Sequence, residues 1–165
     1  MMNLMSSEIR IVIDDLTSAQ VQALIGMHLE AMHQASPADS VHAYGLEQLR
    51  APGVTVWSAW DGVDLLGIGA LHHEMGSDQG EIKSMRTADQ HLRRGVARAL
   101  LRRILVHAKS TGLTRVSLET GTGAAFEASH RLYLGEGFEP CGPFGSYVDD
   151  PHSRFFTLDL RASGR

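Results

Sequence analysis

The chain contains a single cysteine, Cys141, among its 165 residues. One cysteine cannot form a disulfide within the chain, and it cannot supply a cysteine-rich zinc site. No apolar stretch approaches the roughly 20 residues that span a bilayer. The first residues also lack the apolar segment of a secretory signal peptide. We therefore expect a cytoplasmic protein without a membrane partner.

The chain also lacks an excess of positive charge, since 15 Lys and Arg oppose 19 Asp and Glu for a formal net charge of −4. Nucleic-acid binders normally carry a basic surface, so we expect no nucleic-acid partner. The histidines lack metal-site spacing. His72 and His73 are adjacent and would face opposite sides of a strand, whereas His28 and His33 are not four residues apart as in a helical zinc pair. We therefore expect no metal.

The length and composition are those of one globular domain. The chain is 43% hydrophobic and 21% charged, and a chain of this length buries about 70% of its unfolded surface. We expect a single domain over residues 1–162 and a short tail over 163–165.

Strand-like and helix-like patterns alternate along the chain, which predicts a mixed α/β fold. Glycines at 67 and 69 weaken one predicted strand or mark a bulge in it. A helix begins at Thr17 or Ser18 and ends before Ser36-Pro37. Strands are predicted over 9–13, 54–60, 63–74, 81–87, 115–119, 138–141 and 154–160, with further helices over 46–50, 94–110 and 124–134.

The loop before the helix predicted over 94–110 has the features of a phosphate site. The N-terminus of a helix presents free N–H groups and a partial positive charge. Gly95 removes the Cβ that would keep a ligand from the backbone. Arg93, Arg94 and Arg98 add positive charge at the end of a helix where arginine is normally unfavourable, and a bound anion would resolve that conflict. The alternative is an ordinary basic loop in which a glycine begins a helix.

Two segments carry a family resemblance. Residues 93–97 (RRGVA), followed by Leu100 and Leu101, resemble the acyl-CoA-binding segment of the GNAT family of N-acetyltransferases. Residues 132–138 (LYLGEGF) resemble the second signature of that family at a fitting separation. By residues 81–87 and 118–121, the chain is further identified as a member of a bacterial subgroup of uncharacterised N-acetyltransferases.

The resemblance implies an α/β GNAT-like fold, with a mainly antiparallel sheet flanked by helices and splayed between its fourth and fifth strands. Acetyl-CoA, the implied co-substrate, would lie between the strands over 81–87 and 115–119. Two positions depart from the family pattern, because Leu92 replaces a Gln or Arg and Phe126 replaces an Asn. The residues implied to bind the cofactor, largely through main-chain groups, are Met85, Arg86, Thr87, Arg93, Arg94, Gly95, Val96, Ala97 and Arg98.

The resemblance also implies catalytic roles. Attack on a thioester needs a neutral amine, and an alkyl ammonium with a pKa near 10.4 needs a base. Glu119 lies where related ribosomal-protein acetyltransferases have a catalytic glutamate, while Glu81 or a water relay are the alternatives. Tyr133 matches the family tyrosine that protonates the departing thiolate. The Met85 N–H would stabilise the oxyanion.

We therefore expect an N-acetyltransferase that moves an acetyl group to a primary amine of a small molecule or peptide by direct attack in a ternary complex. A non-catalytic acyl-CoA-binding regulatory module and a simple anion-binding module are the alternatives, and homodimerisation is left open. Tyr147, Asp149 and Asp150 either attract a cationic amine or form a solvated acidic turn. His28, on the apolar face of its helix, is a candidate for substrate contact.

Overall fold

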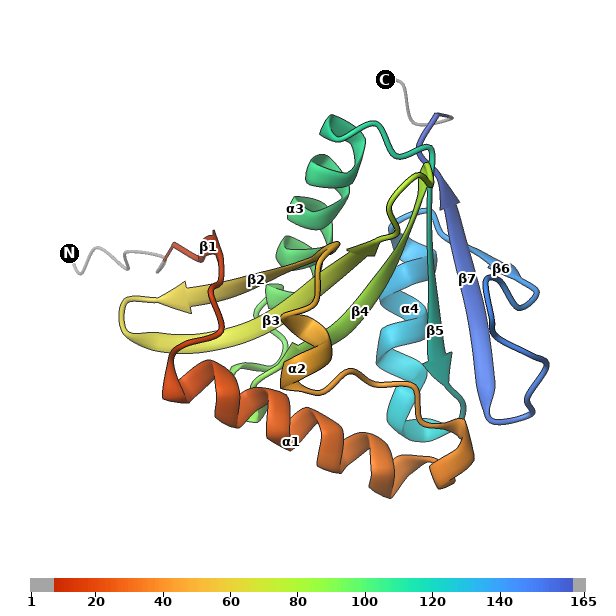
Figure 1. The fold of residues 1–165 in the computed structure, drawn as a ribbon. Coiled ribbons are helices and arrows are strands. Elements are labelled where there is room, and N and C mark those ends of the chain that lie inside the picture. Colours follow the sequence, from red (N-terminus) through yellow and green to blue (C-terminus); the bar gives the residue numbers. More distant parts are fainter. Residues whose placement is uncertain (1–7, 162–165) are drawn as a thin grey trace.

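The computed structural model describes residues 8–161 and contains a seven-stranded sheet with the order β1-β2-β3-β4-β5-β7-β6 (Figure 1). The predicted mainly antiparallel sheet is confirmed, since β4 and β5 form the one parallel pair in this sheet. The tail expected over 163–165 lies outside the described residues. The strands are β1 (Arg10–Ile13), β2 (Val54–Asp61), β3 (Asp64–His73), β4 (Gln79–Thr87), β5 (Arg115–Gly121), β6 (Glu139–Cys141) and β7 (Ser153–Asp159).

Helices cover both faces of the sheet. Helix α3 (Val96–Ser110) and α4 (Glu127–Gly135) pack on one face, while α1 (Ala19–Ala35) and the short α2 (Leu46–Leu49) lie on the other (Figure 1). The two tryptophans of β2 divide between the two cores, because Trp57 belongs to the α3 side and Trp60 packs on the α1 side. This separation follows from the alternation of side chains along a strand.

The predicted splay between β4 and β5 is present. The two strands pair at only three positions, and the last of these joins Glu81 to Ser117. Beyond this point the two ribbons diverge (Figure 1), although β5 continues to pair with β7 along its whole length. The far half of β4 therefore has a free edge that faces the open half of β5.

A bulge bends β4 beside this gap. The register between β3 and β4 shifts between Ile68 and Ala70, and Ser84 adopts a φ of 56°. A Cβ on Gly69 would lie 2.6 Å from Met85 Sδ, so the bulged strand needs a glycine opposite it. The extra residue of this bulge lies in β4. The bulge expected in the strand that carries the glycines is found where the register of β3 with β2 shifts between Gly67 and Leu65.

Local signals set the helix ends with one exception. Ser18 caps α1 by accepting a hydrogen bond from the Val21 N–H, and α1 ends before Pro37 as predicted. The single helix predicted over 124–134 is wrong in detail, because a 3-10 turn (Ala124–Phe126) precedes α4. Phe126 has a φ of −109° and ψ of 0° there, which interrupts regular α-helical geometry.

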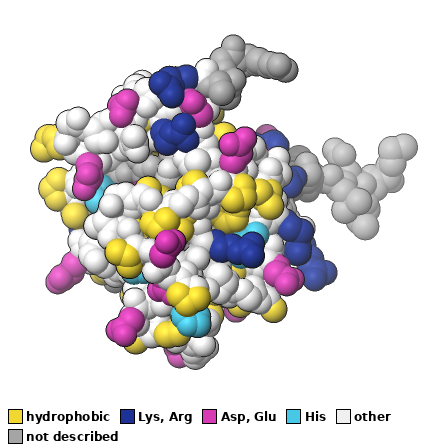
Figure 2. Space-filling view, turned by 90° about the vertical axis from the view of Figure 1, so that its right-hand side faces the viewer, with side chains coloured by type: hydrophobic (Ala, Val, Ile, Leu, Met, Phe, Trp, Pro, Cys, Tyr) yellow, Lys and Arg dark blue, Asp and Glu magenta, His cyan; other side chains and the backbone are white. Residues whose placement is uncertain are grey.

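Acidic and basic side chains are interspersed on the face that carries the end of the sheet near β7, and hydrophobic side chains gather near its middle (Figure 2). This face presents a mixed surface, in agreement with the modest formal charge of −4.

Substituting Gly67→Ala tests the close approach of β3 to β4 and α3. The new Cβ would lie 2.8 Å from the carbonyl oxygen of Arg86 and 3.0 Å from Val96 Cγ1. Because the nearest atom belongs to the backbone, we expect a loss of about 1–3 kcal/mol in the free energy of unfolding. Urea denaturation measures this loss.

Gly26→Ala is the matched control. Gly26 lies in α1, and a Cβ added to it would meet nothing within 4 Å, so alanine there should stabilise the protein by up to about 1 kcal/mol. Equal effects of the two substitutions would contradict the crowding at Gly67.

Candidate functional site

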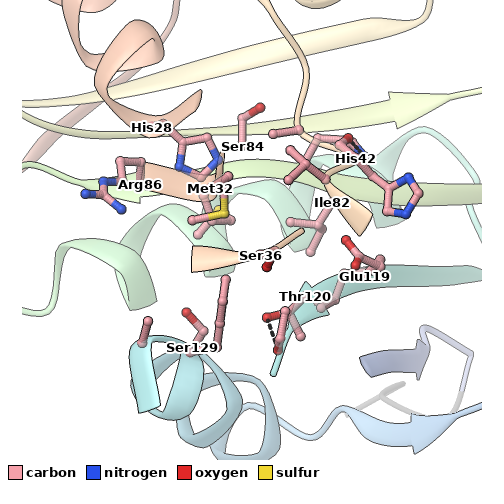
Figure 3. A pocket seen from close by; sticks show the side chains of 18 of the residues that line it. His28, Met32, Ser36, His42, Ile82, Ser84, Arg86, Glu119, Thr120 and Ser129 are labelled. Atoms are coloured by element: carbon pink, nitrogen blue, oxygen red, sulfur yellow. Dashed lines mark hydrogen bonds between the residues drawn. The ribbon is translucent and has the colours of Figure 1, made fainter. Parts of the chain in front are cut away.

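A pocket of about 140 Å³ occupies the gap between β4 and β5 (Figure 3). Its walls come from five parts of the chain. Helix α1 contributes His28 and Met32, and the segment after it contributes His42. Strands β4 and β5 form two sides, and α4 with the turn before it closes the last side. The diverging strands thus create one space that is lined by all five parts.

The start of α3 forms an open backbone cradle. Gly95, the residue before the helix, has a φ of 78°, and a Cβ placed on it would meet nothing within 4 Å. No side chain caps this helix start, and its first turn contains no acidic residue. The first N–H groups of a helix lack acceptors within the helix, so residues 95–98 present free donors here. This end of α3 fits the phosphates of coenzyme A.

The three arginines at the start of α3 that are predicted to hold the cofactor differ in their surroundings. Arg94 forms an ion pair of 3.0 Å with Asp61, and Arg98 Nε forms one of 3.0 Å with Glu136 Oε1. Arg93 is exposed beside the cradle with a φ of 64°. Leu92, the first departure from the family pattern, is 57% exposed. Because Arg94 and Arg98 already pair with acidic side chains, this cradle relies mainly on its backbone N–H donors.

The far half of β4 offers a second backbone surface. Because pairing with β5 ends at Glu81, the main-chain groups of Met85 and Thr87 lie on the edge that faces the gap. An unpaired strand edge can bind an extended amide chain. The Met85 side chain packs on the α3 side, whereas Arg86 lines the pocket from the α1 side. Of the predicted residues of β4, Met85 and Arg86 thus line the pocket, whereas Thr87 lies at the end of the strand outside its lining.

Glu119 lies near the end of β5 and lines the pocket. The Ser153 hydroxyl donates a hydrogen bond of 2.7 Å to Glu119 Oε2. Burial raises the pKa of this carboxyl above its usual value, and the Ser153 hydrogen bond together with the nearby Lys83 charge opposes that shift. A carboxylate with a raised pKa and one free oxygen suits proton transfer.

Tyr133 lines the pocket from α4 and is 5% exposed. Its ring packs against Phe138 and Phe156 with centroid distances of 5.6 and 6.3 Å. Burial raises the pKa of the phenol, so the hydroxyl stays protonated at neutral pH. Phe126, the second departure from the family pattern, packs against Gly121 at the same wall.

Sequence reasoning missed a buried lysine beside Glu119. Lys83 is 7% exposed, and its Nζ donates to the His42 carbonyl oxygen at 2.9 Å and to the Tyr147 hydroxyl at 3.0 Å. Its Nζ also lies 3.4 Å from Glu81 Oε2 and 4.4 Å from the centre of the Tyr44 ring. The available signal was the spacing of Glu81 and Lys83, because residues two apart on a strand share a face.

The same contacts engage Glu81, the alternative base. Tyr147 donates a short hydrogen bond to Glu81 Oε2, the oxygen that also faces Lys83. Asp150, one of the acidic residues considered for amine binding, accepts a hydrogen bond of 2.6 Å from Ser40. That hydrogen bond lowers the Asp150 pKa. Glu81 therefore links the loop before β7 to β4, and Asp150 links the same loop to the segment after α1.

His28 is buried within the pocket wall and is 7% exposed. Its Nδ1 and the Ser84 hydroxyl are buried polar atoms without a hydrogen-bond partner among the described residues. Burial, followed by the charges of Arg86 and Lys83, lowers the pKa of His28 to about 4. The imidazole is therefore neutral at pH 7. His28, which the sequence made a candidate for substrate contact, lines the pocket.

Residues 20–138 match the Acetyltransferase (GNAT) family. The chain belongs to this family. It is 51% identical over 148 residues to the uncharacterised N-acetyltransferase YsnE of Bacillus subtilis, with 90% of this chain and 97% of that protein covered. It is 54% identical over 147 residues to the uncharacterised N-acetyltransferase YedL of Escherichia coli, with 89% and 92% covered. The predicted resemblance to a bacterial subgroup is confirmed.

Solved structures agree with the fold. An acyl-CoA N-acyltransferase from Klebsiella pneumoniae aligns with a TM-score of 0.75 at 23% identity, covering 93% of this chain and 99% of that one. A Bacillus subtilis acetyltransferase in complex with CoA aligns with a TM-score of 0.65 at 17% identity, covering 92% and 99%. These likenesses show the fold, whereas the family match and the relatives YsnE and YedL show that the protein is an acyltransferase of a family that uses acetyl-CoA.

Among residues 8–161, no helix is long and apolar enough to cross a membrane. The same range holds no group of three or more His, Cys, Asp or Glu side chains placed to bind a metal ion. Cys141 is partly buried, and burial raises the pKa of its thiol.

The neutral His28 predicts a pH-dependent stability. Its pKa is about 4 in the folded protein against 6.5 for an ordinary histidine, so between these values only the unfolded chain binds the proton. As the pH falls from about 6.5 to about 4, this residue should remove about 3 kcal/mol from the free energy of unfolding. Urea denaturation across this pH range should show that the free energy of unfolding depends less on pH in His28→Gln than in the wild type.

His33→Gln is the matched control, because His33 lies exposed on the same helix. Its stability curve should run parallel to that of the wild type. Parallel curves for wild type and His28→Gln would contradict the burial of a neutral imidazole.

Proposed function

We propose that the protein transfers the acetyl group of acetyl-CoA to a primary amine of a small molecule or peptide by direct attack in a ternary complex. The observation that supports this most directly is the pocket between β4 and β5, which is lined by Met85, Glu119 and Tyr133 together. Met85 supplies the N–H group that stabilises the oxyanion, Glu119 the base and Tyr133 the acid that aminolysis of a thioester needs.

The acetyl donor would be held mainly by backbone groups. The free N–H groups at the start of α3 suit the diphosphate, with the positive charge of Arg93 beside them. The open edge of β4 at Met85 and Thr87 suits the amides of the pantetheine arm. Bound there, acetyl-CoA supplies an activated acetyl group. The remaining members of the proposed binding set are Arg86, Arg94, Gly95, Val96, Ala97 and Arg98.

Glu119 is the proposed base. An amine arrives mostly as an ammonium ion at neutral pH, and Glu119 accepts its proton to free the lone pair. Its raised pKa makes it a stronger base than an exposed glutamate. Ser153 holds one carboxylate oxygen, which leaves the other oxygen for the amine.

Met85 and Tyr133 complete the reaction. The Met85 N–H donates to the carbonyl oxygen, where negative charge develops as the nitrogen–carbon bond forms. Tyr133 then donates its hydroxyl proton to the sulfur as the carbon–sulfur bond breaks, so the thiol leaves neutral. Burial keeps this phenol protonated before transfer by raising its pKa. The attacking nitrogen loses its second proton to solvent, and solvent returns a proton to the tyrosinate.

Tyr133→Phe tests the role of the acid within the proposed function. With acetyl-CoA and a panel of primary amines, thiol release should fall on the order of 100-fold in the variant, because no proton reaches the departing sulfur. The affinity for CoA, measured by calorimetry, should remain near that of the wild type.

Three other outcomes would redirect the proposal. Equal turnover in wild type and Tyr133→Phe would exclude this residue as the acid. Tight CoA binding without acetylation of any amine would favour the non-catalytic acyl-CoA-binding module. Binding of CoA no tighter than that of inorganic phosphate would favour a simple anion site.

Glu119→Gln tests the base. Loss of the proton acceptor should lower kcat/KM at neutral pH by about 10²–10⁴-fold. In the wild type, activity should decline as the pH falls through the raised pKa of Glu119, and the variant should lose this decline. A pH–rate profile for both proteins measures the effect.

Glu127→Gln, at an exposed position in the first turn of α4, is the matched control. Its profile should overlay the wild type. A normal rate in Glu119→Gln together with a collapse in Glu81→Gln would transfer the role of the base to Glu81.

A further inference from the structure

Two buried polar atoms in the pocket wall are left unused by the proposed mechanism. His28 is 7% exposed and Ser84 is 9% exposed, yet neither His28 Nδ1 nor Ser84 Oγ has a hydrogen-bond partner among the described residues. Burying such atoms without a partner costs about 1–3 kcal/mol each. Both residues line the pocket, so a ligand group that accepts hydrogen bonds would recover this cost.

The positive charges beside these atoms are not equally available. Lys83 is fully engaged by Glu81, Tyr147 and the His42 carbonyl group. Arg86 lines the pocket, and its ion pair with Asp89 is long, at 3.6 Å, to a partner that is 66% exposed. Exposed pairs of this kind contribute little. Because the proposed cofactor contacts on β4 use main-chain groups, the Arg86 side chain retains the capacity to bind a second anion.

The pocket thus has two chemically different ends. His28 and Arg86 lie toward one end and Glu119 and His42 toward the other, as Figure 3 shows. A molecule with an anionic group and an amine matches this arrangement. Apolar side chains, among them Met32, Val41 and Ile82, also line the pocket and suit an aliphatic or aromatic substituent.

We propose that His28, Ser84 and Arg86 form a carboxylate subsite, and that the acceptor is therefore an α-amino acid or a closely similar amino carboxylate. The carboxylate accepts hydrogen bonds from these three side chains while the amine meets Glu119. This inference rests on the proposed function, since it names the acceptor of the same site. One guanidinium with two neutral donors suits a single negative charge better than a phosphate dianion.

Matched acceptors test the subsite directly. Each L-amino acid with an apolar side chain is compared with its decarboxylated amine, such as leucine with isoamylamine and phenylalanine with phenethylamine. The amino acid should have the higher kcat/KM, on the order of 10- to 100-fold. Calorimetry with CoA-saturated protein should show the same preference in binding, independently of turnover.

Arg86→Gln should collapse the ratio of the two kcat/KM values toward one. Arg103→Gln is the matched control, because Arg103 is an exposed arginine of α3 outside the pocket, and its ratio should equal that of the wild type. His28→Leu should reduce the ratio in the same direction as Arg86→Gln, although less.

The outcomes separate this inference from the proposed function. If amines are acetylated but the carboxylate brings no advantage, or if Arg86→Gln changes only the KM for acetyl-CoA and leaves the ratio intact, the subsite is wrong and the acetyltransferase stands. If amino acids bind with an Arg86-dependent preference and no acetyl transfer occurs, the subsite stands and the catalytic proposal falls. If no amino acid binds, the subsite is wrong.

Discussion

The early end of pairing between β4 and β5 is the constraint on which the site depends. Beyond Glu81 and Ser117 the strands separate, and the backbone of β4 faces a pocket instead of a neighbouring strand. Unpaired backbone groups in a sheltered place are costly. A ligand with amides along its length can form hydrogen bonds with these groups. The missing β4–β5 pairing therefore weakens the sheet but suits β4 to hold the arm of an acyl-CoA. The bulge at Ser84 bends β4 at this point while β3 keeps its pairing on both sides of it.

The wall of the pocket contains two kinds of buried polar group, one with hydrogen-bond partners and one without partners among the described residues. Lys83 is buried with partners on each side, and those partners come from β4, the segment after α1 and the loop before β7. The contacts that stabilise its charge therefore also fix two loops near Glu119. His28 has the opposite character, since its Nδ1 is buried and has no partner among the described residues, beside Arg86. Buried polar groups are normally hydrogen-bonded, so the partners of Lys83 indicate a structural role and the unpartnered His28 indicates a binding surface.

Local patterns in the sequence accounted for most elements because their causes are local. The helix starts at Ser18 and Gly95 and the helix end before Pro37 depend on neighbouring residues alone, and each is found near its predicted position. The regular helix predicted over 124–134 was wrong, since Phe126 packs across the chain against Gly121 and interrupts the first turn. The role of Lys83 was missed for the same reason, because its main partners, apart from Glu81, lie about 40 or more residues away.

The sequence by itself determined the family, the order of strands and helices, and the glycine that leaves the start of α3 open. The order of elements along the chain follows from side-chain periodicity, and the open helix start follows from the conformational freedom of glycine. The family followed from the resemblance of residues 93–101 and 132–138 to known signatures. Tertiary structure alone decided which polar groups meet in the pocket: Glu119 with Ser153, Lys83 with Tyr147, and His28 near Arg86. The burial of these groups and the charges around them depend on segments that the fold brings together across the gap between β4 and β5. No local sequence pattern encodes which distant segments will meet there.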